Sequence, residues 1–592
     1  MATDVLTHEI KITITGFDSE EIVFSNLNIN QSIASHHHFN FIWRIGAFQS
    51  DPDIQSKVMD YIGKDVSITM ASSIFKGIIT EISIEERNDG QVIHIAGQSP
   101  TILLEDAPRS TSYYKQNLKS IVQKSVADFS GNLLKENINP AYTDEIHYLA
   151  QYNETDFQFL KRLAVRYGEW FYFDGEKLQF GELQNSNKTL RNNIEITELV
   201  FQSNLQANKY SYTGMDSHKG EKIEDNMADL KYSGDGFTKV AVEKSKSIFS
   251  RKDPKRSIHV MNTSNKKQLD IIKLLDSKAA VARAMTIRGQ SFSPELRPGY
   301  RFKIDLRGNT PEFIVTNVVH HSLNTSNYTN SFTAVSAKIE VPPYTNPHVV
   351  RKSEMQPAII VDNKDSDKLG RLKVKFPWTD LSPWIRMSAP HSGKDKGWHF
   401  IPEIGEDVMI DFEGGDVDKP FIIGSLYHGN SKSGLGDNNN DIKSLKTRSG
   451  NTIILNDKDG SITIKDAQGS VLILKGDDTI ELTSKTKIVI KSKDIDIKAD
   501  NSINISAGGS LNIKSGGDMA LNSQSNMKQD SLKEFKISSK DNLETSSLKD
   551  TKIKATMNMS IEGTMKTEVK GLQTSIQGTV QTEVKGAMVM IN

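Results

Sequence analysis

The last quarter of the chain, residues 480–591, carries a repeat that is compatible with only a few folds of this segment. Apolar residues come in pairs two positions apart, such as Ile503 and Ile505, and the pairs recur every eight residues with occasional slips of one. A spacing of two puts both members of a pair on one face of a β-strand. Each eight-residue unit therefore holds one short strand and a corner, and it spans at most about 26 Å.

A unit of this length cannot enclose a core alone, because it offers only one or two apolar side chains. Other copies of the chain can supply the missing walls. The repeat therefore predicts that three chains wind together into a three-sided, intertwined β-helix with a thin apolar core. The alternative is a disordered polar tail, but disorder gives no reason to keep register over so many repeats.

The amino-acid composition argues against several other classes of protein. The chain has 592 residues, which suggests three to five domains. Its 73 Lys and Arg balance 74 Asp and Glu, so no global attraction to nucleic acid or membrane is indicated. It has no cysteine, which excludes disulfides and cysteine zinc sites. We expect no signal peptide and no membrane-spanning helix.

The first 345 residues are predicted to alternate between β and α structure. Short β-rich runs at 8–14, 41–45, 66–70, 75–84 and 92–95 indicate a β domain over 1–108. An α-containing insert follows at 110–185, and a second β region at 195–345 includes a helix over 267–287. Within the insert, Thr155 begins a helix that Gly168 can end. Asp174-Gly175 then predicts a tight hairpin turn.

The segment from Gln151 to Phe173, with its Phe157, Arg162 and Trp170 in sequence, resembles the signature of VgrG proteins. These are spike proteins of the bacterial type VI secretion system, related to the hub and tail-needle proteins of contractile phages. The resemblance implies that residues 1–345 form a phage-hub-like base with β-barrel-like domains, and we call this range the hub.

Residues 356–429 contain five short strand-like runs, which suit an OB-type barrel. Gly370 to Val374 and Phe412 to Pro420 resemble the VgrG OB domain, and we keep that name for 356–429. A linker is expected at 430–446, and the trimeric β-helix, which we call the needle, at 447–592. The predicted fold is thus mainly β, with an α+β hub, an OB-fold barrel and a C-terminal β-helix.

The resemblance implies a structural function, without catalysis and without a cofactor. A homotrimer would cap the tube of Hcp rings in the baseplate, puncture a target membrane on sheath contraction, and carry effector or adaptor proteins. Such a protein is cytoplasmic before firing and is then secreted, into the medium or into target cells, without a signal peptide. One alternative is the hub and spike of a phage tail or related extracellular injection particle. Another, less favoured, is an enzyme on a β-helical stalk that acts on cell-wall polymer.

Three candidate chemical sites are weighed and set aside. His36-His37-His38 alternate faces of a strand and lack a carboxylate at ligand spacing, so a metal site is not expected. An OB barrel can bind single-stranded nucleic acid, but acidic residues share this domain and weaken any basic groove. Motifs of hydrolases, zinc proteases and P-loop enzymes are missing from the sequence.

The end of the chain is the one predicted binding site. A prism that ends leaves strand edges and apolar side chains exposed. The VgrG resemblance implies a PAAR-repeat tip protein there. Its predicted seat is Met588, Val589, Met590, Ile591 and Asn592. The alternative is that these residues are simply the last turn of the core.

Overall fold

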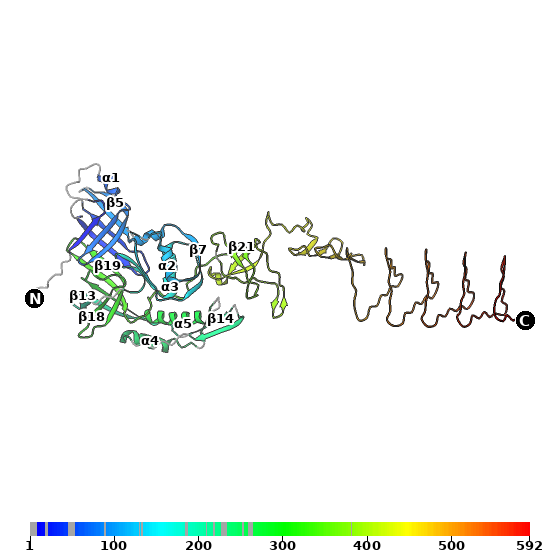
Figure 1. Cartoon of the computed structure of the whole chain (residues 1–592). Coiled ribbons are helices and arrows are strands. Elements are labelled where there is room, and N and C mark those ends of the chain that lie inside the picture. Colours follow the sequence, from blue (N-terminus) through cyan, green and yellow to red (C-terminus); the bar gives the residue numbers. More distant parts are fainter. Residues whose placement is uncertain are drawn as a thin grey trace. The chain divides into compact units, whose positions relative to one another are not determined.

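The structure is a computed structural model of the whole chain that divides into two compact units, Met1–Leu482 and Thr483–Asn592 (Figure 1). Each unit is described by itself. The structure describes residues 9–591 except 18–21, 45–53, 88–89, 130, 132–133, 184–187, 209, 217–218, 227–231, 233, 252–253, 259–264 and 381. Among these residues, no helix is both long and apolar enough to cross a membrane.

The two β regions of the hub share one twelve-stranded sheet. Its main path runs β1-β4-β5-β6-β3-β2-β19-β20-β17-β13, and β18, which pairs with β19, also carries β12. The strands are β1 (Ile10–Ile14), β2 (Phe24–Ser32), β3 (His38–Trp43), β4 (Asp65–Met70), β5 (Ser73–Arg87), β6 (Gly90–Gln98), β12 (Lys188–Arg191), β13 (Ile196–Ser203), β17 (Met285–Ser291), β18 (Arg301–Asp305), β19 (Glu312–Ser322) and β20 (Tyr328–Ser336).

The antiparallel pairing of β2 with β19 joins the two regions, with Asn30 opposite Val319. Sequence patterns gave no strand at β2, because polar residues interrupt its apolar ones. Leu27 and Ile29 nevertheless alternate inward, and the next inward position is the buried amide of Gln31. Helix α1 (Ile54–Met59) connects β3 to β4, and the short 3-10 helix η1 (Pro100–Glu105) follows β6 and leads into the insert.

The insert between the β regions has the predicted helices and several strands. It contains β7 (Arg109–Asn117), α2 (Leu118–Val126), β8 (Lys135–Asn139), β9 (Glu145–Glu154), α3 (Asp156–Tyr167), β10 (Trp170–Phe173) and β11 (Lys177–Gly181). Thr155 caps α3 by accepting a hydrogen bond from the Gln158 N–H, and Gly168 ends the helix at φ 72°. Both predictions are confirmed. The Asp174-Gly175 turn is also confirmed, because it joins the paired strands β10 and β11.

A second helical layer follows, with β14 (Ser211–Asp216), β15 (Glu221–Asn226), α4 (Gly236–Ile248), β16 (Lys255–Ser257) and α5 (Asn265–Ala282). The expected helix over 267–287 was too long at its C-terminal end. Met285 and Ile287 instead belong to β17, where they are buried in the core of the second β region. Burial in that sheet outweighs the helical preference of the preceding alanines.

The OB domain is a small closed barrel. Strands β22 (Lys373–Lys375), β21 (Gln356–Asp362), β25 (Asp407–Phe412) and β26 (Pro420–Ser425) form a sheet in that order. The fifth expected strand, at 384–387, makes only isolated bridges, from Ile385 to Leu372 and from Met387 to Ile422. These bridges link the β22 side to β26 and close the ring. A minor hairpin, β23 (Ser392–Gly393) with β24 (Lys396–Gly397), extends from the barrel.

The residues after the barrel differ from the expected linker and β-helix. Strand β27 (Ile442–Lys446) lies inside the expected linker 430–446, and it begins a five-stranded antiparallel meander. The others are β28 (Thr452–Asn456), β29 (Ser461–Lys465), β30 (Val471–Leu474) and β31 (Ile480–Thr483). Gly450, Gly460 and Gly469 take positive φ at the turns, which reverses the chain between strands. The first part of the expected needle is therefore a meander.

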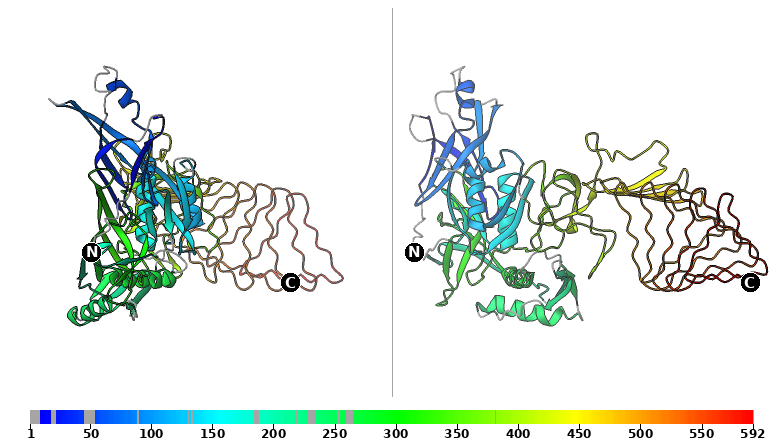
Figure 2. Two further views of the ribbon diagram at one scale, coloured as in Figure 1. Left: turned by 90° about the vertical axis from the view of Figure 1, so that its left-hand side faces the viewer. Right: turned by 45° about the vertical axis from the view of Figure 1, so that its right-hand side comes forward.

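From Thr483 onward the chain is an open coil, with wide turns and no sheet (Figure 2). Bends recur every eight residues, at 500–501, 508–509, 516–517, 524–525, 532–533, 540–541, 548–549, 556–557, 564–565 and 572–573. The eight-residue unit read from the sequence is thus present as a straight segment and a corner. We call residues 483–591 the coil.

Candidate functional site: the joint between the hub and the OB domain

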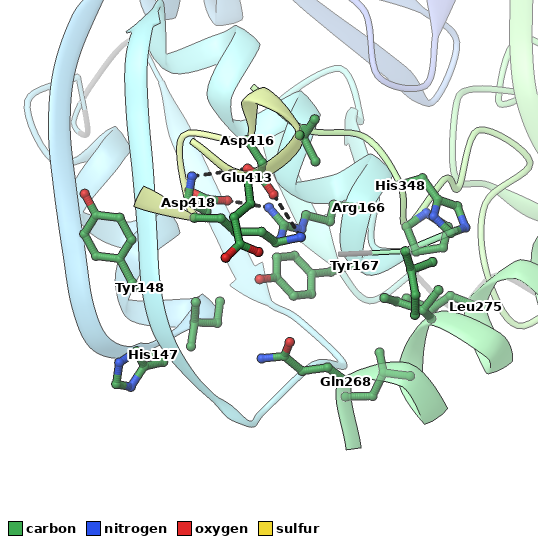
Figure 3. Close-up of a pocket in the computed structure, with 18 of the residues that line it drawn as sticks. His147, Tyr148, Arg166, Tyr167, Gln268, Leu275, His348, Glu413, Asp416 and Asp418 are labelled. Atoms are coloured by element: carbon green, nitrogen blue, oxygen red, sulfur yellow. Dashed lines mark hydrogen bonds and ion pairs between the residues drawn. The ribbon is translucent and has the colours of Figure 1, made fainter. Parts of the chain in front are cut away.

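A cluster of charged side chains, several of them buried, lies where the hub meets the OB domain. Strand β9, which pairs with β7, and helix α3 of the hub contact the barrel loop that includes 3-10 helix η2 (Glu413–Gly415) and continues to Lys419. A cleft of about 320 Å³ opens beside this contact, and α5 forms another part of its wall (Figure 3). We call the contact the joint.

Asp418 is the central acceptor of the joint. One carboxylate oxygen, Oδ1, accepts a hydrogen bond from the backbone N–H of Ala150 at 2.7 Å. The other, Oδ2, lies 2.5 Å from Nη1 of Arg166 and 4.0 Å from Nη1 of Arg162. Figure 3 shows Arg166 extending from the hub toward this carboxylate. A carboxylate on the barrel is therefore compensated by arginines of α3.

Arg162 connects α3 to the adjacent strand β9. Its guanidinium donates to both carboxylate oxygens of Glu154, with Nε–Oε1 at 2.9 Å and Nη2–Oε2 at 2.8 Å. It also donates to the carbonyl of Ala150 at 2.7 Å. Both charged side chains are buried, and a two-pronged arginine–carboxylate pair fixes direction as well as distance. The barrel thus docks on a rigid hub surface.

Burial also changes the acid–base properties of the joint. The pKa of Asp416 is raised, first because the carboxyl group is buried and second because Asp418 is negative nearby. Its Oδ1 accepts the backbone N–H of Asp418 at 3.2 Å, and Lys419 Nζ lies 3.4 Å from Oδ2. Burial likewise raises the pKa of the Tyr167 hydroxyl. These shifts follow from packing at the joint.

Apolar and backbone contacts complete the joint. Tyr148 and Ala150 of β9 belong to the barrel's own core cluster. The rings of Tyr152 and Trp378 lie 5.4 Å apart. The connecting segment is held too, since Arg351 Nε donates to the Tyr152 carbonyl at 2.8 Å. The arrangement fixes two parts of the chain to each other.

The structure separates the residues of the other sequence candidates. Buried His37 contacts the Ser32 carbonyl and Gln31, while His36 contacts Thr101 and lies 3.2 Å from Glu105. Within the described ranges, no group of three or more His, Asp or Glu is placed to hold a metal.

The basic residues weighed for nucleic-acid binding each have a carboxylate neighbour. Arg371 lies 2.7 Å from Asp365, and Lys373 lies 3.5 Å from Asp362. Arg386 pairs with Glu413. Of the barrel's tryptophans, Trp378 belongs to the joint, Trp384 lies under Lys373, and the ring of Trp398 lies near that of Phe400.

The predicted tip residues Met588, Val589, Met590 and Ile591 are exposed at the end of the coil, and Asn592 lies outside the described residues. Sequence reasoning did not find the joint itself. Asp416 and Asp418 entered only through the Phe412 to Pro420 motif and as acidic residues that weaken a nucleic-acid groove, and Arg166 was not singled out. Its partner lies 252 positions away, so no local spacing could signal the pair.

Two family models match separate regions of the chain. Residues 39–326 match the family model of the phage tail baseplate hub (GPD). Residues 356–427 match that of the type VI secretion system/phage-baseplate injector OB domain. The joint therefore lies where the two matched regions meet.

Among curated proteins, the chain is 38% identical over 84 residues to the type VI secretion system spike protein VgrG1a of Pseudomonas aeruginosa, covering 12% of this chain and 13% of the relative. It is 27% identical over 169 residues to the actin cross-linking toxin VgrG1 of Vibrio cholerae, covering 24% and 15%. The chain thus spans less than a sixth of the length of these relatives.

A solved structure of the Francisella PdpA-VgrG complex, in its lidded form, matches 81% of this chain and 80% of that chain with a TM-score of 0.50. The identity is 10%, so the match concerns the fold alone. With the hub and injector OB models matched in order, and with spike proteins among the relatives, the chain belongs to the VgrG family.

Proposed function

We propose that the chain is the structural spike of a type VI secretion apparatus, acting as a homotrimer. The observation that carries this proposal is a hub joined to an injector OB domain and followed by a coil that cannot stand alone. Between 484 and 591, the described residues have no backbone–backbone hydrogen bond and no buried side chain.

The coil supplies the physical argument for three copies. Isolated in water, an ordered coil without hydrogen bonds or burial has nothing to offset its loss of conformational entropy. Sibling chains in the same eight-residue register would pair their strands with it and cover its apolar face. The thin core would then consist of the apolar residues on the straight sides of the repeat, such as Ile503, Leu511 and Met519.

In this proposal the hub caps the Hcp tube within the baseplate, and the needle leads through the target membrane when the sheath contracts. The protein is cytoplasmic before firing and leaves with the apparatus, carrying effector or adaptor proteins. The joint has a mechanical role here. Its buried ion pairs between α3 and the barrel would pass axial load from hub to OB domain without hinge motion.

We divide the chain accordingly into hub (1–345), OB domain (356–429), meander (442–483) and β-helix from 483 onward. The division at Thr483 supports starting the β-helix later than the repeat alone suggested. The meander would then form the transition from barrel to needle.

Residues 588–592 are proposed as the seat of a PAAR-repeat tip protein. Apolar side chains at the end of a water-exposed needle favour a capping partner. Deleting 588–592 should abolish co-purification with the PAAR protein but leave the trimer intact. Retained binding would show that these residues are only the last turn of the core.

A second candidate is the hub and spike of a phage tail or related injection particle, because both matched family models describe phage baseplate parts. Capsid genes beside this gene would favour it. One relative is named a toxin, but we propose no reaction for this chain, and hydrolysis of peptidoglycan by the purified protein would argue against a purely structural role.

Native mass measurement of the full chain tests the main proposal. Three copies in one particle are expected. A single copy with a protease-sensitive tail would remove both the needle and the secretion role that rests on it.

A further inference from the structure

The corners of the coil carry a second apolar pattern that the thin core does not explain. From the corner at 548–549 to the corner at 579–580, each successive corner has one apolar side chain. They are Leu548, Met557, Met565, Leu572 and Val580, and all are almost or completely exposed. They are distinct from the paired apolar residues on the straight sides.

The two sets differ in their exposure. On the sides, Met559 is 49% exposed and Ile561 is 72% exposed. At the neighbouring corners, Met557 is 89% exposed and Met565 is 98% exposed. The corner side chains therefore point away from the face that would line the core.

The corner pattern is continuous only in the last part of the coil, where the core is poorer. Among the earlier corners, 508–509 and 516–517 are glycine pairs, 524–525 and 540–541 are polar, and only 532–533 has an apolar side chain, the exposed Leu532. In the later units, polar Thr551 and Thr567 occupy side positions that hold apolar residues in earlier units. Apolar surface is thus lost from the axis and gained at the edges.

Three-fold symmetry determines what lies beside each corner. If each straight side forms one wall of a three-sided prism, successive units of one chain occupy successive walls. The next layer on the same wall then comes from a sibling chain and is one unit further along. Neighbouring layers of a β-stack are about 4.8 Å apart. The corner at 557 of one chain would therefore lie beside the corner at 565 of its sibling.

Resting on the proposed trimer, we propose that these five corner residues form an apolar ladder along each of the three edges, which binds neighbouring chains to one another outside the core. Each rung contacts the corner residue of the adjacent unit in a sibling chain. The ladder replaces the cohesion that the threonines remove from the axis.

Register favours sibling chains over other occupants. Met557 and Met565 are both the second residue of their bends and are eight positions apart, as stacking of equivalent corners requires. A lipid layer fits this surface poorly, because Lys549 and Lys566 lie directly beside corner residues and charge is costly in hydrocarbon.

A cysteine pair tests the ladder, and the absence of native cysteine gives a clean background. The full-length variant M557C/M565C is compared with the single variants M557C and M565C after mild oxidation. Disulfides need Cα atoms within about 4.4–6.8 Å, which adjacent rungs satisfy. Within one chain, the same two residues are separated by a whole straight side, about 26 Å long when extended.

The expected result is a covalent trimer on a non-reducing gel for the pair, and monomer for each single variant. Native mass is measured on the same samples. A trimeric particle without cross-links, whose cysteines react rapidly with maleimide, would overturn the ladder but leave the spike intact. Protection that requires an added PAAR protein would instead assign the corners to the tip partner. A monomeric particle would refute the proposed function itself.

Discussion

Removing the charge of Asp418 should release the OB domain from the hub. In Asp418→Asn, the partly buried Arg166 loses the carboxylate that lies 2.5 Å from its guanidinium, while a similar side-chain shape is kept. Breaking a buried pair on one side costs about 3–5 kcal/mol. We take about 3 kcal/mol, because the Arg166 side chain remains 20% exposed. That value corresponds to an increase of about 100-fold in the undocked population.

Limited trypsin digestion under native conditions measures this population. Lys352 lies in the connecting segment, and its backbone bridges to Asp416 in the barrel loop. Cleavage after Lys352 should therefore require undocking, and its rate should follow the undocked fraction when reclosing is fast. We expect cleavage of the Asp418→Asn variant to be about 100-fold faster than that of the unchanged chain.

Glu413→Gln is the matched control, because Glu413 belongs to the same loop but pairs with Arg386, which is half exposed. Such a pair contributes about 0–1 kcal/mol, so cleavage should rise by a few-fold at most. Equal cleavage rates for the two variants would refute the view that Asp418 holds the barrel.

Two further predictions concern the hub sheet. Burial lowers the pKa of His37 and of His320 to about 3, so below pH 6.5 the unfolded chain binds more protons than the folded chain. Denaturant unfolding should therefore show a loss of stability of about 2 kcal/mol per histidine between pH 7 and pH 5. The variant His320→Gln should remove about half of this dependence of stability on pH. In Gly97→Ala the new Cβ would lie 2.1 Å from the Ile78 carbonyl oxygen, so thermal unfolding should show that stability falls by about 3 kcal/mol. The control Gly424→Ala, whose Cβ would meet no atom within 4 Å, should change the stability little.

Local signals in the sequence predicted local structure well. The Thr155 cap, the Gly168 helix end and the Asp174-Gly175 turn depend on neighbouring residues, and the structure confirms all three. The eight-residue period likewise reappears as evenly spaced bends. In each case the interacting residues that determine the local structure lie within a few positions of one another along the chain.

Features decided by distant residues were missed or misjudged. Strand β2 depends on pairing with β19, and its polar residues obscure the alternation. The end of α5 depends on Met285 joining a sheet. The joint depends on Arg166 and Asp418, which meet only after hub and barrel have folded. None of these pairings produces a recognisable pattern among residues that are close together in the sequence.

The pairing of β2 with β19 has a consequence for synthesis on the ribosome. Strand β2 is complete by Ser32, but its partner ends at Ser322, so nearly three hundred residues must follow before the pair can close. At about 5–20 residues per second, the nascent N-terminal region waits tens of seconds with an open strand edge. An unpaired edge invites aggregation. Factors that shield nascent chains should therefore matter most for this protein during the first half of its translation.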